Sequence, residues 1–157
     1  LDDIETSGVQ FIWQTGKYYN ASIMQQLKSH KELPMLRALD FISDMGAAYK
    51  AADLVISRAG ASSISEFCLI GKPVILVPSP NVAEDHQTKN AMALVDRDAA
   101  MMVRDIEAKD KVIRLALDTV MDQHKLDSLS ENVLKLGLPH SADVIADEVL
   151  KLAENKQ

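Results

Sequence analysis

The sequence predicts an α/β fold: a Rossmann-like, mostly parallel sheet with helices on both faces and a helical C-terminal tail. Short apolar runs alternate with amphipathic stretches between residues 9 and 103, a pattern typical of βαβ units. After residue 106 the apolar residues recur only with helical spacing. The length of 157 residues matches about one domain of ordinary size. We therefore expect residues 1–157 to form a single domain.

The predicted strands are short apolar runs, bounded in two places by glycine or proline. They cover residues 9–13, 35–41, 54–57, 74–77 and 99–103. Gly16 follows the first, and Pro34 stops whatever precedes the second. The run at 74–77 is uniformly apolar, so it has no face suited to water. Such a strand belongs inside a parallel sheet that is covered on both faces.

The predicted helices between these strands cover residues 19–29, 43–50, 61–70 and 84–95, and Gly71 closes the third of them. The C-terminal tail contains three apolar stripes with helical spacing. They are formed by Val112, Leu115, Ala116 and Val120, by Leu126, Leu129, Val133 and Leu136, and by Ile145, Val149 and Leu152. Gly137 and Pro139 separate the second stripe from the third, where Ser141 is the expected cap.

Composition excludes several classes of protein. The net charge of −6 argues against a general nucleic-acid binder, which needs Lys and Arg to displace counterions. No apolar run approaches the roughly 20 residues of a membrane span. Cys68 is the only cysteine, so a reducing compartment fits, and its place on an apolar helix face makes it a small hydrophobe rather than a nucleophile. The four histidines are scattered, and we expect no metal or other cofactor.

The chain begins with Leu1 and carries no basic-then-apolar signal segment. We expect it to be a piece of a longer protein.

Ligands of open parallel sheets bind beyond the carboxyl ends of the strands, so the loops at those ends are candidate sites. The first is the small-residue turn around Gly60, where another group can approach the backbone closely. The free amides at Ala61 and Ser62, where the next helix starts, suit a phosphate. Two interpretations of Arg58 are open. It could contact a phosphate, or it could be the solvated or ion-paired arginine that is usual at a strand end.

Two readings also stand for Ser63 and Glu66, which are three residues apart on one helix. The carboxylate of Glu66 could accept both hydroxyls of a ribose, as acidic residues do in other nucleotide folds. Alternatively, the two residues form a capping box that satisfies the helix amides without any ligand. Spacing alone favours the capping box.

The second loop leads through prolines into a polar helix start, where His86, Gln87 and Asn90 cluster. These side chains offer the donors and acceptors that sugar hydroxyls need. The alternative is that this segment only begins a helix, because Glu84 and Asp85 suit a helix N-terminus and a lone histidine there is usually a surface residue.

The third loop contains Ile42 and Met45. The backbone of Ile42 could present its polar groups to a base edge, with Met45 packing on the base. The stronger alternative is that Ser43 or Asp44 caps a short helix and Met45 belongs to the core.

Taken together and in order, these segments resemble the carboxyl-terminal domain of the MurG family of bacterial GT-B glycosyltransferases. The segments that carry the resemblance are Trp-Gln-Thr-Gly at 13–16, Phe-Ile-Ser-Asp-Met at 41–45, Ala-Asp-Leu-Val-Ile-Ser-Arg-Ala-Gly at 52–60, Ser-Glu at 65–66 and His-Gln-Thr-Lys-Asn-Ala at 86–91. The resemblance covers roughly residues 9 to 153. Members of that family transfer N-acetylglucosamine from UDP-GlcNAc to undecaprenyl-diphosphate-linked N-acetylmuramyl-pentapeptide.

The resemblance implies a role for each candidate residue. Ile42 would hold the uracil edge through its backbone, with Met45 nearby. Ala61 and the helix start after Gly60 would face the diphosphate or the sugar, and Arg58 lies in the same segment. Ser62 and Ser63 would line the nucleotide, and Glu66 would bind the ribose hydroxyls. His86, where many members have glutamine, and Gln87 would contact the GlcNAc hydroxyls, with Asn90 beside them.

The chain also departs from the family pattern. It lacks the glycine-rich loop that follows the first strand of the domain and helps to hold the diphosphate, and it lacks the amino-terminal domain. We therefore expect the first strand of the sheet to be missing, an edge strand to be left unpaired, and the fragment alone to be inactive. The acceptor site, the catalytic base and peripheral contact with the cytoplasmic face of the inner membrane are expected only in the whole protein.

Other interpretations stay open from sequence alone. The chain could belong to another UDP-sugar GT-B enzyme, such as a glycolipid glycosyltransferase or a UDP-GlcNAc 2-epimerase. It could also be a nucleotide-sugar-binding module that works with a partner subunit. A receiver-like domain would need clustered acids at its strand ends, whereas Asp44 and Asp53 are the only such residues here.

Overall fold

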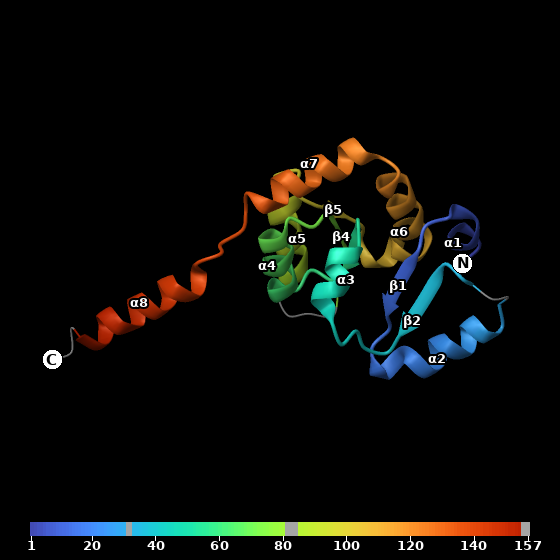
Figure 1. The fold of residues 1–157 in the computed structure, drawn as a ribbon, viewed down its shortest axis with the longest axis horizontal. Coiled ribbons are helices and arrows are strands. Elements are labelled where there is room, and N and C mark those ends of the chain that lie inside the picture. The colour runs from blue at the N-terminus through green and yellow to red at the C-terminus, as the bar shows by residue number, and fades with distance from the viewer. Residues whose placement is uncertain (31–32, 81–84, 155–157) are drawn as a thin grey trace.

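The computed structural model describes residues 1–30, 33–80 and 85–154 of the chain. Helices and strands alternate up to β5 and only helices follow it, as the sequence predicts (Figure 1). The strands are β1 (Phe11–Gln14), β2 (Leu36–Leu39), β3 (Val55–Ser57), β4 (Val74–Leu76) and β5 (Met101–Met102). The helices are α1 (Asp2–Ser7), α2 (Lys17–Lys28), α3 (Met45–Ala51), α4 (Ala61–Ile70), α5 (His86–Val95), α6 (Asp105–Val120), α7 (Gln123–Leu134) and α8 (Ser141–Glu154).

The strands pair in parallel but form two sheets rather than one. One sheet has the order β1-β2 and the other β3-β4-β5. Phe11 is opposite Leu36 in the first sheet, and Val55 is opposite Val74 in the second. A doubly wound sheet of order 3-2-1-4-5-6 would place one further strand between β1 and β3, and no described residue forms it. The expected unpaired edge is therefore present twice, once on β1 and once on β3.

Strand β4 organises the larger sheet because both of its faces are covered. All three of its residues are buried, as its uniformly apolar sequence predicts. Val74 and Leu76 belong to a core with residues of α4, α5 and α7, including Phe67. Ile75 points to the opposite face and packs with Ala116 of α6. Helices therefore cover both faces of this sheet, and its strand ends are held rigidly.

Helix boundaries follow the local signals closely in the middle of the chain. Helix α4 has the predicted limits and ends at Gly71, whose φ of 65° is the left-handed conformation that glycine adopts without strain. Helix α3 starts after Asp44, whose side chain accepts a hydrogen bond from the N–H of Ala47 at 2.8 Å. Of the two expected caps, Asp44 is therefore the correct one. The predicted start of α5 at Glu84 lies outside the described residues.

Several elements differ from the prediction. The strands are shorter, because the apolar runs continue past the residues that form ladders. Helix α1 was not predicted. Its single buried residue, Ile4, gives no periodic pattern.

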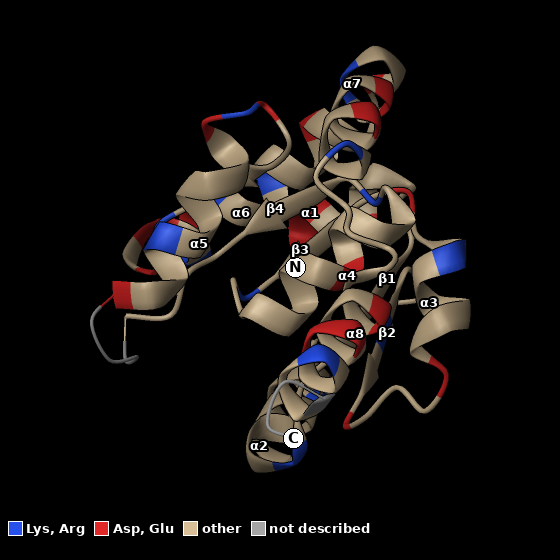
Figure 2. Cartoon of the chain, turned by 90° about the vertical axis from the view of Figure 1, so that its left-hand side faces the viewer, with Lys and Arg blue, Asp and Glu red and all other residues tan. Residues whose placement is uncertain are grey.

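The helical tail divides into a packed part and a projecting part. Helices α6 and α7 contribute to the cores, whereas α8 extends away from the body (Figure 1). The predicted stripe of Ile145, Val149 and Leu152 is 60–66% exposed, so no described residue covers it. In the ribbon of Figure 2, positions of acidic and of basic residues both occur along α7 and α8. No helix among the described residues is long and apolar enough to cross a membrane.

Candidate functional site

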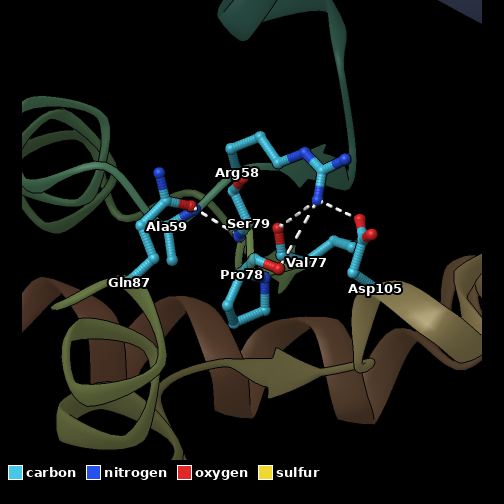
Figure 3. Close-up of polar contacts among 7 residues, drawn as sticks. All are labelled: Arg58, Ala59, Val77, Pro78, Ser79, Gln87 and Asp105. Carbon is cyan, nitrogen blue, oxygen red and sulfur yellow. Dashed lines mark hydrogen bonds and ion pairs between the residues drawn. The ribbon is translucent and has the colours of Figure 1, made fainter. Parts of the chain in front are cut away.

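Arg58 connects the end of β3 to two other elements (Figure 3). Its guanidinium donates hydrogen bonds to the carbonyl oxygens of Val77, at 3.2 Å, and Pro78, at 3.5 Å, just after β4. It also pairs with the carboxylate of Asp105 at the start of α6. Of the two readings of Arg58, the structure supports the ion-paired residue, which fixes the ends of two neighbouring strands relative to each other.

Gln87 holds the loops after β3 and β4 together (Figure 3). Its side-chain oxygen accepts hydrogen bonds from the backbone N–H groups of Ala59, at 3.2 Å, and Ser79, at 2.9 Å. One turn later on α5, the side-chain amide of Asn90 donates to the carbonyl oxygen of Ala59 at 3.2 Å. Two of the predicted sugar-binding residues are therefore brought to the Gly60 loop. His86 is exposed at the first position of the same helix.

The start of α4 has no side-chain cap. Gly60 occupies the cap position, and the first bond of the helix runs from the N–H of Ile64 to its carbonyl oxygen at 3.0 Å. The N–H groups of Ala61, Ser62 and Ser63 precede that bond, so they have no partner within the helix. The capping box favoured by spacing is wrong, because Ser63 lies three residues inside the helix rather than at its cap.

Glu66 is exposed on α4 and contacts α3 instead of its own helix start. The hydroxyl of Tyr49 donates to its Oε2 atom at 3.1 Å. The ring of Tyr49 packs edge-on against Phe67, with centroids 5.6 Å apart and planes at 76°. Burial, and then the bond to Glu66 and its negative charge, raise the pKa of Tyr49. The phenol is therefore protonated and acts as a donor at neutral pH.

Ile42 lies in the loop between β2 and α3, where its N–H donates to the side-chain oxygen of Gln14 at 2.8 Å. Gln14 is the last residue of β1. Met45, the first residue of α3, is half-buried. The structure thus places Ile42 and Met45 at the ends of the two strands of the smaller sheet.

These contacts form a continuous series across the strand ends. Gln14 bonds Ile42, helix α3 leads to Tyr49, Tyr49 bonds Glu66, and helix α4 leads back to the loop held by Gln87. Gln14 and Tyr49 were given no role from sequence. Gln14 lies within a quoted motif, but only the packing of α3 against α4 could reveal Tyr49.

Buried Cys68 is confirmed as part of the core, and burial raises the pKa of its thiol. Among residues 1–30, 33–80 and 85–154, no three His, Cys, Asp or Glu side chains gather to hold a metal ion.

Parallel strands with helices on both faces and an uncapped helix start at the carboxyl edge define a Rossmann-like α/β domain. Residues 1–146 match the glycosyltransferase family 28 C-terminal domain, and the chain belongs to that family.

Curated relatives include the UDP-N-acetylglucosamine–N-acetylmuramyl-(pentapeptide) pyrophosphoryl-undecaprenol N-acetylglucosamine transferases of Bacteroides thetaiotaomicron and Parabacteroides distasonis. The first is 63% identical over 96% of this chain and the second 55% identical over 99%. The chain spans only 40% and 42% of their lengths, respectively.

Two solved structures share the fold. The crystal structure of Acinetobacter baumannii MurG aligns with a TM-score of 0.78 and 27% identity, covering 94% of this chain and 46% of that one. The glycosyltransferase VinC, solved in complex with dTDP, aligns with a TM-score of 0.74 and 17% identity, covering 98% and 36%. At that identity VinC supports the fold alone.

Proposed function

We propose that this chain is the donor-binding part of a glycosyltransferase that moves N-acetylglucosamine from UDP-GlcNAc to undecaprenyl-diphosphate-linked N-acetylmuramyl-pentapeptide. The observation that carries the proposal is the 63% identity to a transferase of that name over nearly the whole chain. The series of contacts from Gln14 to Gln87 supports it, because it links Ile42, Glu66 and Gln87, to which the family resemblance assigns donor contacts.

Each part of the donor has a candidate partner in this arrangement. The backbone of Ile42 faces the uracil edge, with Met45 beside it, and the Glu66 carboxylate accepts the two ribose hydroxyls. Ser62 and Ser63 line the nucleotide. The uncapped amides from Ala61 onward receive the diphosphate, since a helix N-terminus carries partial positive charge and free donors.

The sugar lies against the second loop. His86 and Gln87 contact GlcNAc hydroxyls, with Asn90 beside them. Because the side-chain oxygen of Gln87 already accepts two backbone N–H groups, its NH₂ group is the part that is directed to the sugar. Arg58 and Gly60 shape the turn between diphosphate and sugar rather than carry chemistry.

The reaction proposed for the whole protein is an inverting transfer. A hydroxyl oxygen of the acceptor bonds to the anomeric carbon of GlcNAc, the bond from that carbon to the diphosphate breaks, and UDP leaves with the electron pair. The amides at the start of α4 stabilise the charge that grows on the leaving diphosphate. The base that takes the acceptor proton, the lipid-binding surface and peripheral attachment to the cytoplasmic face of the inner membrane belong to the rest of the protein.

Replacing Glu66 in the whole enzyme tests the proposal. Glu66→Ala should raise the KM for UDP-GlcNAc about tenfold or more, because the ribose loses a charged hydrogen-bond acceptor worth roughly 1.5–3 kcal/mol. The KM for the lipid acceptor should stay the same. An unchanged donor KM would remove Glu66 from the ribose site.

A further inference from the structure

We propose that Tyr49 is a positioning residue for the donor site: its phenol fixes the Glu66 carboxylate in the orientation that receives the ribose. This inference rests on the proposed ribose role of Glu66. It adds a second residue of α3, besides Met45, to the candidate site.

The first support is the hydrogen bond itself. The Tyr49 hydroxyl donates to Oε2 of Glu66 at 3.1 Å, and the two residues are 17 positions apart, on different helices. A carboxylate has about four lone-pair positions, of which the phenol uses one. Oε1 and the second lone pair of Oε2 stay available for a pair of vicinal hydroxyls.

The second support is the rigidity of the phenol. The Tyr49 ring is half-buried and makes a T-shaped contact with Phe67, a residue of α4 that is 1% exposed and lies in the core. A ring anchored in this way keeps its hydroxyl at one place. Glu66, in contrast, is exposed and has several rotatable bonds, so without a partner it would lose conformational freedom each time a ligand bound.

The third support is that Glu66 does not cap its own helix. Glu66 is six residues beyond the cap of α4, so it cannot reach back to the helix start as a capping-box glutamate does. Its bond to Tyr49 therefore serves no capping purpose, and it directs an exposed carboxylate along the surface between α3 and α4.

The experiment uses the whole enzyme that contains this chain. Tyr49→Phe removes only the hydroxyl and keeps the ring against Phe67. We expect the KM for UDP-GlcNAc to rise about fivefold and kcat to change less than twofold, since the loss affects donor binding rather than the transfer step. Tyr19→Phe on α2 makes the same chemical change at a residue that is 68% exposed, and it should leave both constants unchanged.

A double-mutant cycle separates positioning from a general structural role. In a Glu66→Ala background, Tyr49→Phe should cause no further rise in donor KM. Glu66→Asp, which keeps the charge but withdraws it from the phenol, should become insensitive to Tyr49→Phe in the same way. The effect of Tyr49→Phe should also shrink when the donor lacks the ribose 2′-hydroxyl.

The outcomes distinguish this inference from the function on which it rests. A donor KM that is unchanged in Tyr49→Phe, or that rises equally in the Glu66→Ala background, overturns the positioning role and leaves the ribose role of Glu66 standing. A donor KM that is unchanged in Glu66→Ala overturns both.

Discussion

The side chain of Gln14 accepts the backbone N–H of Ile42 at 2.8 Å, which ties the end of β1 to the loop after β2. Two more side chains hold this region: Asp40 accepts the N–H of Phe41 and Asp44 accepts the N–H of Ala47, each at 2.8 Å. The amide that we propose to face the uracil therefore already donates to Gln14. A uracil that accepts a hydrogen bond from the Ile42 N–H must either displace the Gln14 oxygen or form a bifurcated hydrogen bond together with it.

Removing the Gln14 side chain should free that amide. In Gln14→Ala the Ile42 amide should exchange with deuterium about fivefold faster, because a net hydrogen bond of about 1 kcal/mol is lost. Peptide-resolved exchange over residues 40–44 measures the change. Gln14→Glu retains an acceptor and is the matched control. Equal exchange in Gln14→Ala and the parent chain would contradict this role.

Substitution by alanine should have different effects at Gly60 and at Gly137: at Gly60 it should affect donor binding, and at Gly137 it should affect stability. Gly60 has an ordinary φ of −69°, and among the described residues the atom nearest to a Cβ there would be Ser63 Oγ, at 3.9 Å. At Gly137 a Cβ atom would lie 2.7 Å from the carbonyl oxygen of Cys68. Gly60→Ala should keep the melting temperature but raise the donor KM, because the added methyl group occupies the approach to the α4 amides.

Gly137→Ala should instead lower the free energy of unfolding by about 1–3 kcal/mol, the usual cost of overpacking. Thermal melting and donor kinetics on both variants check the pair. A normal donor KM in a stable Gly60→Ala variant would show that no ligand group comes close to this backbone.

Gln87→Glu separates the two functions assigned to this side chain. Glutamate keeps acceptor oxygens for the amides of Ala59 and Ser79, and its charge suits the first turn of α5. It loses the NH₂ donors proposed to reach the sugar. The variant should therefore fold normally but discriminate poorly between UDP-GlcNAc and UDP-GalNAc or UDP-glucose, as measured by the ratio of kcat/KM values.

Gln87→Leu is the companion variant, because it removes the acceptor as well. It should lose about 1–3 kcal/mol of stability, since two loop amides lose their partner. If selectivity among the UDP-sugars survives in Gln87→Glu, the residue only holds the loops.

Arg58 should matter more to stability than its partner does. Arg58→Ala leaves the carbonyl oxygens of Val77 and Pro78 without their donor, and both residues are buried, so we expect a loss of about 1–2 kcal/mol. Asp105→Ala breaks only the ion pair, whose Arg58 side chain is 56% exposed. That should cost less than about 1 kcal/mol. Urea unfolding of both variants measures the difference, and equal losses would show that the ion pair dominates.

The chain should lose stability in acid partly through Glu107. Hydrogen bonds from Arg104 and Lys111 lower the pKa of its carboxyl from 4.5 to about 2. A carboxyl with a depressed folded-state pKa stabilises the fold above pH 4.5, and that contribution is lost as the pH falls from 4.5 towards 2. Melting temperatures between pH 2 and 7 should therefore fall less steeply in Glu107→Gln. Identical slopes would show that these exposed pairs contribute nothing.

Sequence reasoning was most accurate where one local rule decides the structure. Gly71 ends α4, Asp44 caps α3, and the uniformly apolar β4 is buried on both faces. Predictions from sequence were least accurate where contacts between elements had to be inferred from residue spacing alone. Ser63 and Glu66 have the spacing of a capping box, yet the helix begins two residues before Ser63, so the interpretation fails.

For the candidate site, too, local rules succeeded and tertiary contacts could not be predicted. The loops after the strands could be identified, because parallel strands bring their carboxyl ends to one edge. The hydrogen-bond partners of the side chains in these loops could not be identified from the sequence. The oxygen of Gln87 accepts from two amides, of which that of Ala59 is 28 positions away. Arg58 donates to two carbonyl groups 19 and 20 positions away. Tyr49 has no spacing relation to Glu66 that a periodic pattern could detect.

The split sheet also has a consequence for the order of folding. Every ladder joins strands that are consecutive in the chain, through a single crossover: β1 with β2, β3 with β4, and β4 with β5. Neither sheet contains a pairing that must wait for the other, so β1-α2-β2 can nucleate independently of β3-α4-β4. Because loop-closure entropy grows with the separation of the paired strands, pairing strands that are neighbours in the chain is the least costly way to form these parallel ladders. We expect the two half-sheets to join later, because that step needs contacts between segments that are farther apart in the chain.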